Sequence, residues 1–206
     1  GGIELLDARA ADRFEGRVQI KSLDFSNLVK WRESSKLIER YADLCEFMLI
    51  ESPVPRNDFD GLASFHNFSR WPVSEHVLHI HHGWQLLSQG CVDILNVSPY
   101  LLGGLQASLR LIALAEAAHA SVLIGTTQEL NLGTAAVAHL AAAARVLDYP
   151  SDSTGPHLYT KDVVKAPVQY MNSHLIVPEG PGLGIEVDEE LLREMSGAAQ
   201  WPFGLD

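Results

Sequence analysis

Short apolar runs alternate with longer amphipathic stretches along most of the chain. Residues 92–97 and 121–124 are almost continuously apolar, which is typical of parallel strands that are covered on both faces. Between such runs apolar residues recur at helical spacing, as do Leu109 and Ile112 within 105–118. This repeated order of strand and helix predicts an α/β fold with a parallel sheet.

The same pattern locates the individual elements. Ser26 is expected to cap the first helix, and Gly90 to close the third. Strands are expected at 3–6, 45–50, 72–73, 92–97, 121–124 and 146–147, and residues 23–26 form either a short strand or a loop. Helices are expected at 26–44, within 58–67, and at 77–89, 105–118, 134–144 and 189–195, with a hairpin at 170–177.

The number of strands limits the choice of architecture. About six strands of barrel type can be identified, whereas a closed (β/α)8 TIM barrel has eight. Because bare barrel edges are normally covered, we expect a TIM-type barrel that is incomplete at its N-terminus, a single domain over 1–206 with a closing segment at about 160–206. An open doubly wound sheet is the alternative, but no Gly-rich phosphate turn follows a first strand.

Composition restricts the class of partner. The 206 residues are 47% apolar, enough for one domain with a sizeable core. A net charge of −11 argues against a nucleic-acid partner. No apolar run is long enough to span a bilayer, so no membrane partner is expected. Cys45 and Cys91 are too few for a disulfide scaffold, and buried thiols in a cytoplasmic protein are expected.

Two glutamates stand where strands give way to loops. Glu51 follows the run 45–50, Glu75 follows Pro72-Val73, and the two lie 24 positions apart, about one βα repeat. Carboxylates at the C-terminal ends of neighbouring barrel strands project into one mouth. Paired hard oxygen ligands there suit Mg²⁺. The alternative is that each glutamate simply ends a strand in solvent.

Several collinear segments together resemble the barrel domain of the enolase superfamily, on its mandelate racemase and muconate lactonizing enzyme side. The likeness runs from about residue 45 to the C-terminus. It rests on Ile50-Glu51-Ser52-Pro53, Pro72-Val73-Ser74-Glu75, 92–97 with Gly103-Gly104-Leu105, 114–119, 125–133, Gly155-Pro156, Asp162-Val163 and 178–184.

The resemblance implies a reaction class and a cofactor. Family members bind Mg²⁺ on three acids and remove the proton next to a substrate carboxylate, giving a metal-stabilised enediolate. Glu51 and Glu75 match the second and third ligands. For the first ligand, Asp7 lies in the segment most like the family's Asp-x-Asn element, whereas Asp24 has the better spacing; Asp7 is preferred and Asp24 is the alternative.

The resemblance also marks where this sequence departs from the family. The lysine after the sixth strand aligns with Ser98, and the second-strand lysines would precede Gly1, so the catalytic bases stay unassigned. One-base chemistry therefore fits better than two-base racemisation. Thr127 and Glu129 match substrate-binding positions, with a turn cap and a solvated acid as the alternative.

The histidines of 76–82 have two interpretations. The spacing of His76, His79, His81 and His82 is not a compact zinc ligand set on a helix. A solvated helix, with His76 alone near the mouth, is preferred.

Two function hypotheses follow. The first is an Mg²⁺-dependent lyase or isomerase, of dehydratase, cycloisomerase or epimerase type, that acts on a small carboxylate substrate and forms a homo-oligomer as the superfamily often does. The second is a non-catalytic barrel relic or assembly partner that lacks the general bases.

Overall fold

The computed structural model describes residues 18–43 and 45–196. The chain divides into two compact units, one formed by residues 1–96 with 114–122 and the other by 97–113 with 123–206. The division falls between residues 96 and 97, 113 and 114, and 122 and 123.

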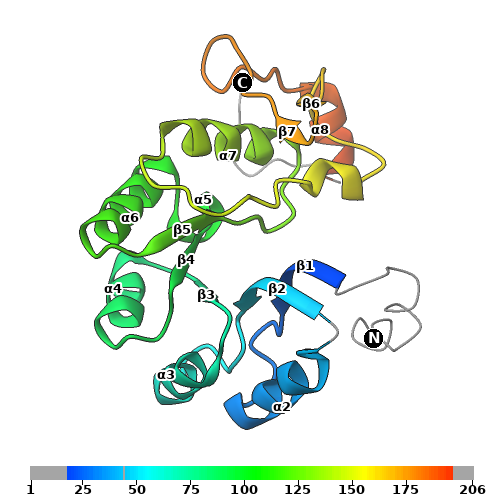
Figure 1. The fold of residues 1–206 in the computed structure, drawn as a ribbon. Helices are drawn as coiled ribbons and strands as arrows, with labels where there is room; N and C mark the ends of the chain where they lie inside the picture. Colours follow the sequence, from blue (N-terminus) through cyan, green and yellow to red (C-terminus); the bar gives the residue numbers. More distant parts are fainter. Residues whose placement is uncertain (1–17, 44, 197–206) are drawn as a thin grey trace. The chain divides into compact units, whose positions relative to one another are not determined.

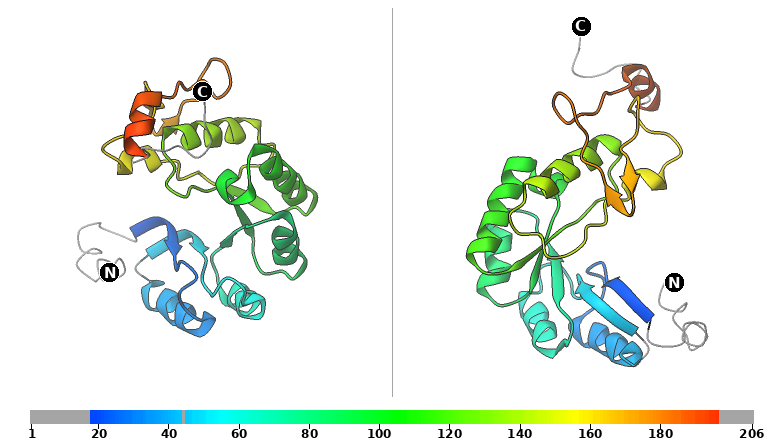
Figure 2. Two further views of the ribbon diagram at one scale, coloured as in Figure 1. Left: turned by 180° about the vertical axis from the view of Figure 1, so that it is seen from behind. Right: turned by 45° about the horizontal axis from the view of Figure 1, so that its top comes forward.

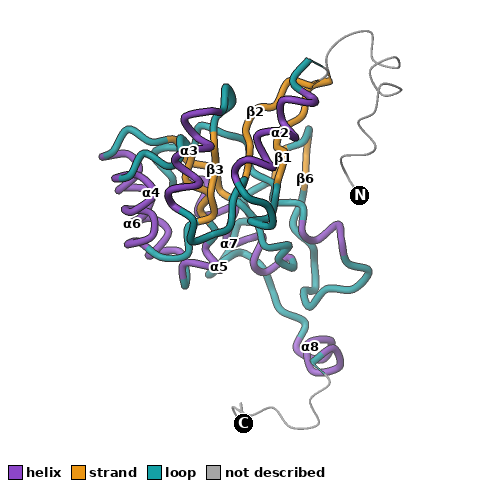
Figure 3. Tube along the Cα trace, turned by 90° about the horizontal axis from the view of Figure 1, so that it is seen from below, coloured by secondary structure: helices purple, strands orange, loops and turns teal. Residues whose placement is uncertain are grey.

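The first unit consists of strand and helix pairs in strict alternation (Figures 1 and 3). Its strands β1 to β4 are parallel and stand side by side in the order in which they occur in the chain. The parallel α/β sheet expected from the sequence is therefore confirmed. The elements are β1 (Val18–Asp24), α2 (Trp31–Tyr41), β2 (Cys45–Glu51), α3 (Phe59–Phe68), β3 (Val73–His76), α4 (Ile80–Ser88) and β4 (Ile94–Val97).

The register of the strands places polar residues at one end of this sheet. Asp24, the last residue of β1, lies opposite Glu51, the last residue of β2. Glu51 in turn lies opposite Ser74, so Glu75 is one residue further along β3. Since the strands are parallel, these acids share the C-terminal edge of the sheet. Glu75 lies inside β3 rather than after it, which corrects the strand expected at 72–73.

Apolar side chains from the strands and helices form the core of this unit. On the strands, Leu49, Ile50, Val73 and Ile94 are completely buried. The helices contribute buried residues at helical spacing, and burying each such side chain stabilises the fold by about 1.5–3 kcal/mol. These helix residues are Ile38, Leu62, Phe65 and Leu86.

Helix α2 begins at Trp31, so the expected start at Ser26 is wrong. The carboxylate of Asp24 accepts hydrogen bonds from the backbone N–H and the hydroxyl of Ser26. Ser26 and Asn27 have φ angles of 52° and 58°, in the left-handed region. Residues in that conformation cannot begin a right-handed helix. The chain turns first, and Lys30 becomes the N-cap.

Helix α4 also begins later than expected. Instead of starting at Val77 it starts at Ile80, because the Nδ1 atom of His79 accepts the backbone N–H of His82 at 3.0 Å. This bond satisfies a donor that the first helical turn would otherwise leave unpaired. Gly90, with φ 63°, follows the end of the helix as expected.

The second unit ends in a C-terminal segment with little regular structure. The hairpin expected at 170–177 is confirmed as the antiparallel pair of β6 and β7, visible in Figure 2 (right). The strand expected at 146–147 is wrong: two apolar residues followed by Asp148 and Pro150 are too few to pair. The elements are α5 (Pro99–Leu102), α6 (Leu105–Ala117), β5 (Ser121–Ile124), α7 (Asn131–Ala143), η2 (Gly155–Leu158), β6 (Tyr170–Met171), β7 (His174–Leu175) and α8 (Glu189–Met195).

None of the helices in the described part of the chain has both the length and the apolar character needed to cross a membrane.

Candidate functional site

Glu51 is held at the end of β2 by side chains from two other strands. One carboxylate oxygen, Oε1, accepts a hydrogen bond from Nδ2 of Asn96 at 2.6 Å. Nε2 of His76 lies 2.9 Å from the same oxygen. The Glu51 side chain is only 8% exposed. A buried carboxylate needs such partners, because desolvation of the charge is costly.

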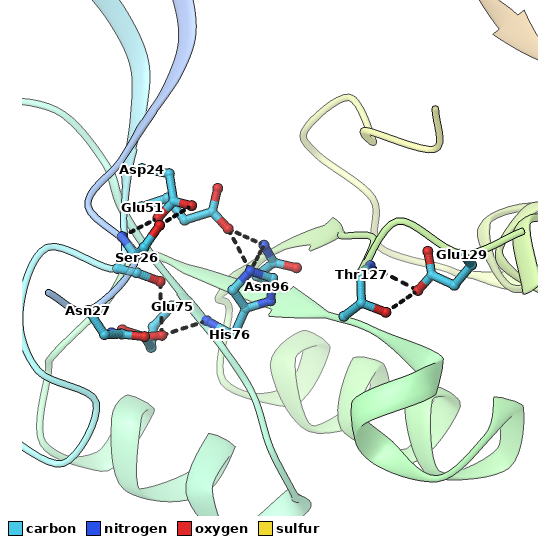
Figure 4. A network of polar contacts seen from close by, with 10 residues as sticks. Asp24, Ser26, Asn27, Glu51, Glu75, His76, Asn96, Thr127 and Glu129 are labelled. Carbon is cyan, nitrogen blue, oxygen red and sulfur yellow. Dashed lines mark hydrogen bonds and ion pairs between the residues drawn. The ribbon is translucent and has the colours of Figure 1, made fainter. Parts of the chain in front are cut away.

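Glu75, the second predicted ligand, is completely buried. Its Oε1 accepts hydrogen bonds from the hydroxyl of Ser52 at 3.1 Å and from the backbone N–H of His76 at 3.0 Å. Its Oε2 accepts Nδ2 of Asn27 at 2.9 Å. Figure 4 shows Glu51 and Glu75 in one polar network with His76, Asn96 and Asn27. The structure therefore brings together the two glutamates that the sequence singled out.

Two residues with left-handed backbone supply the side-chain donors to Glu75. Asn27 has φ 58° and Ser52 has φ 48°. Their backbones are joined, since the N–H of Asn27 donates to the carbonyl of Ser52 at 3.0 Å. Nδ2 of Asn27 also donates to the carbonyl of Val54 at 2.8 Å. The loops after β1 and β2 thus form one support beneath the Glu75 carboxylate.

The two glutamates have opposite electrostatic environments. Burial raises the pKa of Glu75 above its ordinary value, because its three neutral donors do not offset the loss of water. Burial also opposes ionisation of Glu51, but the hydrogen bond and charge of His76, together with Asn96, outweigh it and lower the pKa of Glu51. The pKa of His76 is raised: burial alone would lower it, and the adjacent Glu51 carboxylate reverses that effect.

The first predicted ligand has two candidates, and the structure describes one of them. Asp7 lies outside the described residues. Asp24 ends β1 directly opposite Glu51, at the same edge of the sheet. Its carboxylate is exposed and contacts Ser26 of its own turn, as Figure 4 shows.

The chemistry of these side chains fits a hard divalent cation. Asp24, Glu51 and Glu75 would supply carboxylate oxygens from three successive strand ends, the ligand type that Mg²⁺ prefers. Glu51 keeps Oε2 free of hydrogen bonds within the described residues, and Oδ1 of Asn96 is buried without a partner there. Among residues 18–43 and 45–196, no three His, Cys, Asp or Glu side chains are arranged so that they could hold a metal ion as they stand. His76 and the neutral donors instead take up the carboxylate charge.

Glu129 and Thr127, the predicted substrate-binding residues, contact each other in the second unit. Oε1 of Glu129 accepts the hydroxyl of Thr127 at 2.8 Å and its backbone N–H at 2.9 Å. The hydroxyl of Thr126 donates to the other oxygen. Burial opposes ionisation of Glu129, but these donors outweigh it and lower its pKa. Glu129 also lines a cavity of about 210 Å³ with Tyr100 and Gly133.

The remaining candidates are Ser98 and the histidines at the start of α4. Ser98 is completely buried, and its hydroxyl has no hydrogen-bond partner among the described residues. His79 caps α4, and Nδ1 of His82 accepts the backbone N–H of Leu78 at 3.3 Å. Both side chains therefore bond the backbone rather than gather into a zinc site.

Sequence reasoning missed three residues of the network, Asn27, Ser52 and Asn96. Asn96 carried a readable signal, since it is a polar residue in an otherwise apolar strand end. Asn27 also carried a signal. It follows Asp24 by three residues, one more than in the family's Asp-x-Asn element. Ser52 had no signal beyond following Glu51, because its role depends on an unusual φ angle.

Comparison with known proteins gives a consistent result. Residues 10–191 match the family model described as enolase C-terminal domain-like. Muconate cycloisomerase 1 of Rhodococcus opacus is 31% identical over 147 residues, which cover 70% of this chain and 39% of that protein. Muconate cycloisomerase 1 of Pseudomonas putida is 33% identical over 150 residues, covering 72% and 40%. The chain thus spans about two fifths of the length of these curated relatives.

Solved structures agree with the sequence matches. Muconate cycloisomerase from Pseudomonas fluorescens superposes with a TM-score of 0.78 and 28% identity, covering 84% of this chain and 48% of that one. The L-Ala-D/L-Glu epimerase from Bacillus subtilis superposes with a TM-score of 0.75 and 27% identity, covering 81% and 47%.

Proposed function

Because this chain belongs to the enolase superfamily, as part of the α/β TIM-barrel domain of its mandelate racemase and muconate lactonizing branch, we propose that it serves Mg²⁺-dependent removal of a proton next to a carboxylate. The substrate would be a small organic acid, and the reaction would be of cycloisomerase, dehydratase or epimerase type. The proposal rests on one observation: Glu51 and Glu75 lie in one polar network at the C-terminal ends of adjacent parallel strands.

The acids would hold the cation, with Asp24 as the third. We prefer Asp24 to Asp7 because it ends the neighbouring strand opposite Glu51. When bound, Mg²⁺ would withdraw electron density from the substrate carboxylate and make the adjacent C–H more acidic. Glu75 has a raised pKa, and its hydrogen-bond donors within residues 18–43 and 45–196 are all neutral, so a divalent cation would compensate its buried charge.

The residues around the acids would keep them in place. Asn27 and Ser52 donate to opposite oxygens of Glu75, which fixes the plane of its carboxylate. His76 places an N–H donor or a proton at Oε1 of Glu51. Ionised Glu129, supported by Thr127, would orient a polar group of the substrate.

A specific observation also supports the second candidate, a barrel that has lost its catalytic bases. Ser98, at the position of a family lysine, is buried without a hydrogen-bond partner among the described residues. It cannot act as a base of comparable strength.

For the enzyme, one-base chemistry is expected, such as dehydration or elimination. Detecting racemisation of a substrate's α-carbon by the full-length protein would contradict this expectation.

Isothermal titration with Mg²⁺ tests the metal site. We expect the intact protein to bind Mg²⁺, and Glu51→Gln and Glu75→Gln each to weaken binding at least about tenfold. Glu190→Gln on α8 removes the same charge from an exposed surface and should leave the affinity unchanged. Absence of binding by the intact protein would end the enzyme proposal and leave the non-catalytic alternative.

A further inference from the structure

Asn96 is a buried amide in a strand that is otherwise apolar. It is 2% exposed, and its neighbours Leu95 and Val97 are completely buried. Burying an amide without compensating hydrogen bonds costs free energy, so an apolar residue would be the ordinary choice here. The hydrogen bonds of its amide nitrogen and oxygen therefore indicate why an asparagine stands at this position.

The amide nitrogen of Asn96 directs Glu51. Asn96 lies opposite His76 in the sheet, and both reach across to the same Glu51 oxygen, Oε1. Nδ2 of Asn96 is 2.6 Å from Oε1 and 3.5 Å from Nε2 of His76. With both donors on Oε1, the Oε2 atom is left free of hydrogen bonds within the described part of the chain.

The amide oxygen of Asn96 is buried and has no partner within the described residues. The orientation of the amide is fixed by its other end, because a flipped amide would place oxygen against the carboxylate oxygen of Glu51. Oδ1 must therefore be the free atom. An unpaired buried acceptor destabilises the fold unless a ligand supplies the donor.

Asn131 is a buried asparagine whose bonds are complete. Its Nδ2 donates to Oδ2 of Asp162 at 2.6 Å, the same distance that separates Nδ2 of Asn96 from Oε1 of Glu51. Its Oδ1, however, accepts the backbone N–H of Val168 at 2.8 Å. Asn131 thus has a purely structural set of contacts, whereas Asn96 keeps one acceptor unused.

We propose that Asn96 is a positioning residue for the metal site: its amide nitrogen turns Oε2 of Glu51 toward the cation, and its amide oxygen accepts a hydrogen bond from a water bound to that cation. This inference rests on the proposed function, since it requires Glu51 to be a metal ligand. Mutation of a residue that hydrogen-bonds to a metal ligand typically lowers metal affinity by about 10- to 100-fold.

The test measures binding of Mn²⁺, a spectroscopic substitute for Mg²⁺, by electron paramagnetic resonance. Asn96→Ala and the nearly isosteric Asn96→Leu should each weaken Mn²⁺ binding about 10- to 100-fold. Asn96→Leu guards against failure to fold, because a leucine of similar size suits the apolar strand. Asn131→Ala is the matched control and should keep the Mn²⁺ affinity while losing stability.

A second readout separates positioning from folding. Coupling of Mn²⁺ to ¹⁷O-labelled water counts the ordered waters on the ion, and the Asn96 variants should lose or alter one of them. Folded Asn96 variants that match the intact protein in affinity and in water coupling would overturn the role of Asn96 alone. An intact protein that binds no Mn²⁺ would overturn the proposed function and this inference together.

Discussion

Gly155 leaves no room for a side chain next to Glu129. A Cβ atom at position 155 would lie 2.2 Å from the carbonyl oxygen of Glu129. The obstacle is backbone, which cannot move aside as a flexible side chain can. The turn that carries Glu129 can therefore approach η2 this closely only because residue 155 has no side chain.

Gly155→Ala should displace this turn and destabilise the protein by about 1–3 kcal/mol, as overpacking of a tight contact does. Urea unfolding followed by circular dichroism measures the loss. Gly90→Ala is the control, because position 90 has open space around it and only its φ of 63° disfavours alanine. Equal losses in the two variants would show that the contact with Glu129 is not tight.

Asp24→Asn should weaken Mg²⁺ binding, whereas Asp7→Asn should not. The expected loss for Asp24→Asn is at least about tenfold, since a neutral amide is a poorer ligand than a carboxylate. Isothermal titration of both variants decides between the two aspartates. A loss confined to Asp7→Asn would restore the assignment that the sequence favoured.

Protonation of His82 should lower the stability of the folded protein as the pH drops below the ordinary pKa of histidine. Burial, with the nearby charges of His79 and Arg56, lowers the pKa of His82 in the folded state. The unfolded chain therefore takes up this proton first, so the free energy of unfolding decreases as pH falls through the unfolded pKa. Above that value both states are neutral and the effect vanishes.

His82→Asn tests this effect, because an asparagine oxygen can replace Nδ1 as acceptor for the N–H of Leu78. On going from about pH 7.5 to about pH 5.5, urea unfolding should show a change in the free energy of unfolding that is less destabilising for the variant than for the parent protein. A variant with the parent's full pH dependence would place the titrating group elsewhere.

Ser98→Ala should keep or raise stability. The Ser98 hydroxyl is buried without a partner among the described residues, so its removal should raise the free energy of unfolding by up to about 1 kcal/mol. Asp58→Ala is the contrasting variant: the Asp58 side chain caps α3 through the N–H of Gly61 at 2.8 Å, and its loss should cost about 1 kcal/mol. A destabilised Ser98→Ala would mean that the hydroxyl is bonded after all.

The family and the fold class could be read from the sequence, and both are confirmed by the comparisons. Continuous apolar runs identified β4 and β5 because strands buried on both faces tolerate few polar residues. The glutamates were found for the same reason, since an acid that ends such a run is conspicuous. The positions of Glu51 and Glu75 in one polar network follow from parallel pairing in sequence order.

What the sequence could not give were the features set by single dihedral angles and side-chain bonds. The true start of α2 depends on the turn made by Asp24 with Ser26, which competes locally with the helix. The late start of α4 depends on one imidazole nitrogen of His79. The support of Glu75 by Asn27 spans 48 positions and leaves no periodic trace in the sequence.

The sequential order of β1 to β4 also has a consequence for how this unit folds. Each strand pairs with the strand just before it, roughly 20 to 27 residues away, so each loop closure costs little more than the last. Pairing of strands in sequence order keeps these contacts closer along the chain than pairing of distant strands would. The chain can add one strand and one helix at a time to an existing edge. The contacts of Glu75 with Asn27 and Ser52 involve only residues up to β3, whereas Glu51 gains the hydrogen bond from Asn96 only when β4 has joined the sheet.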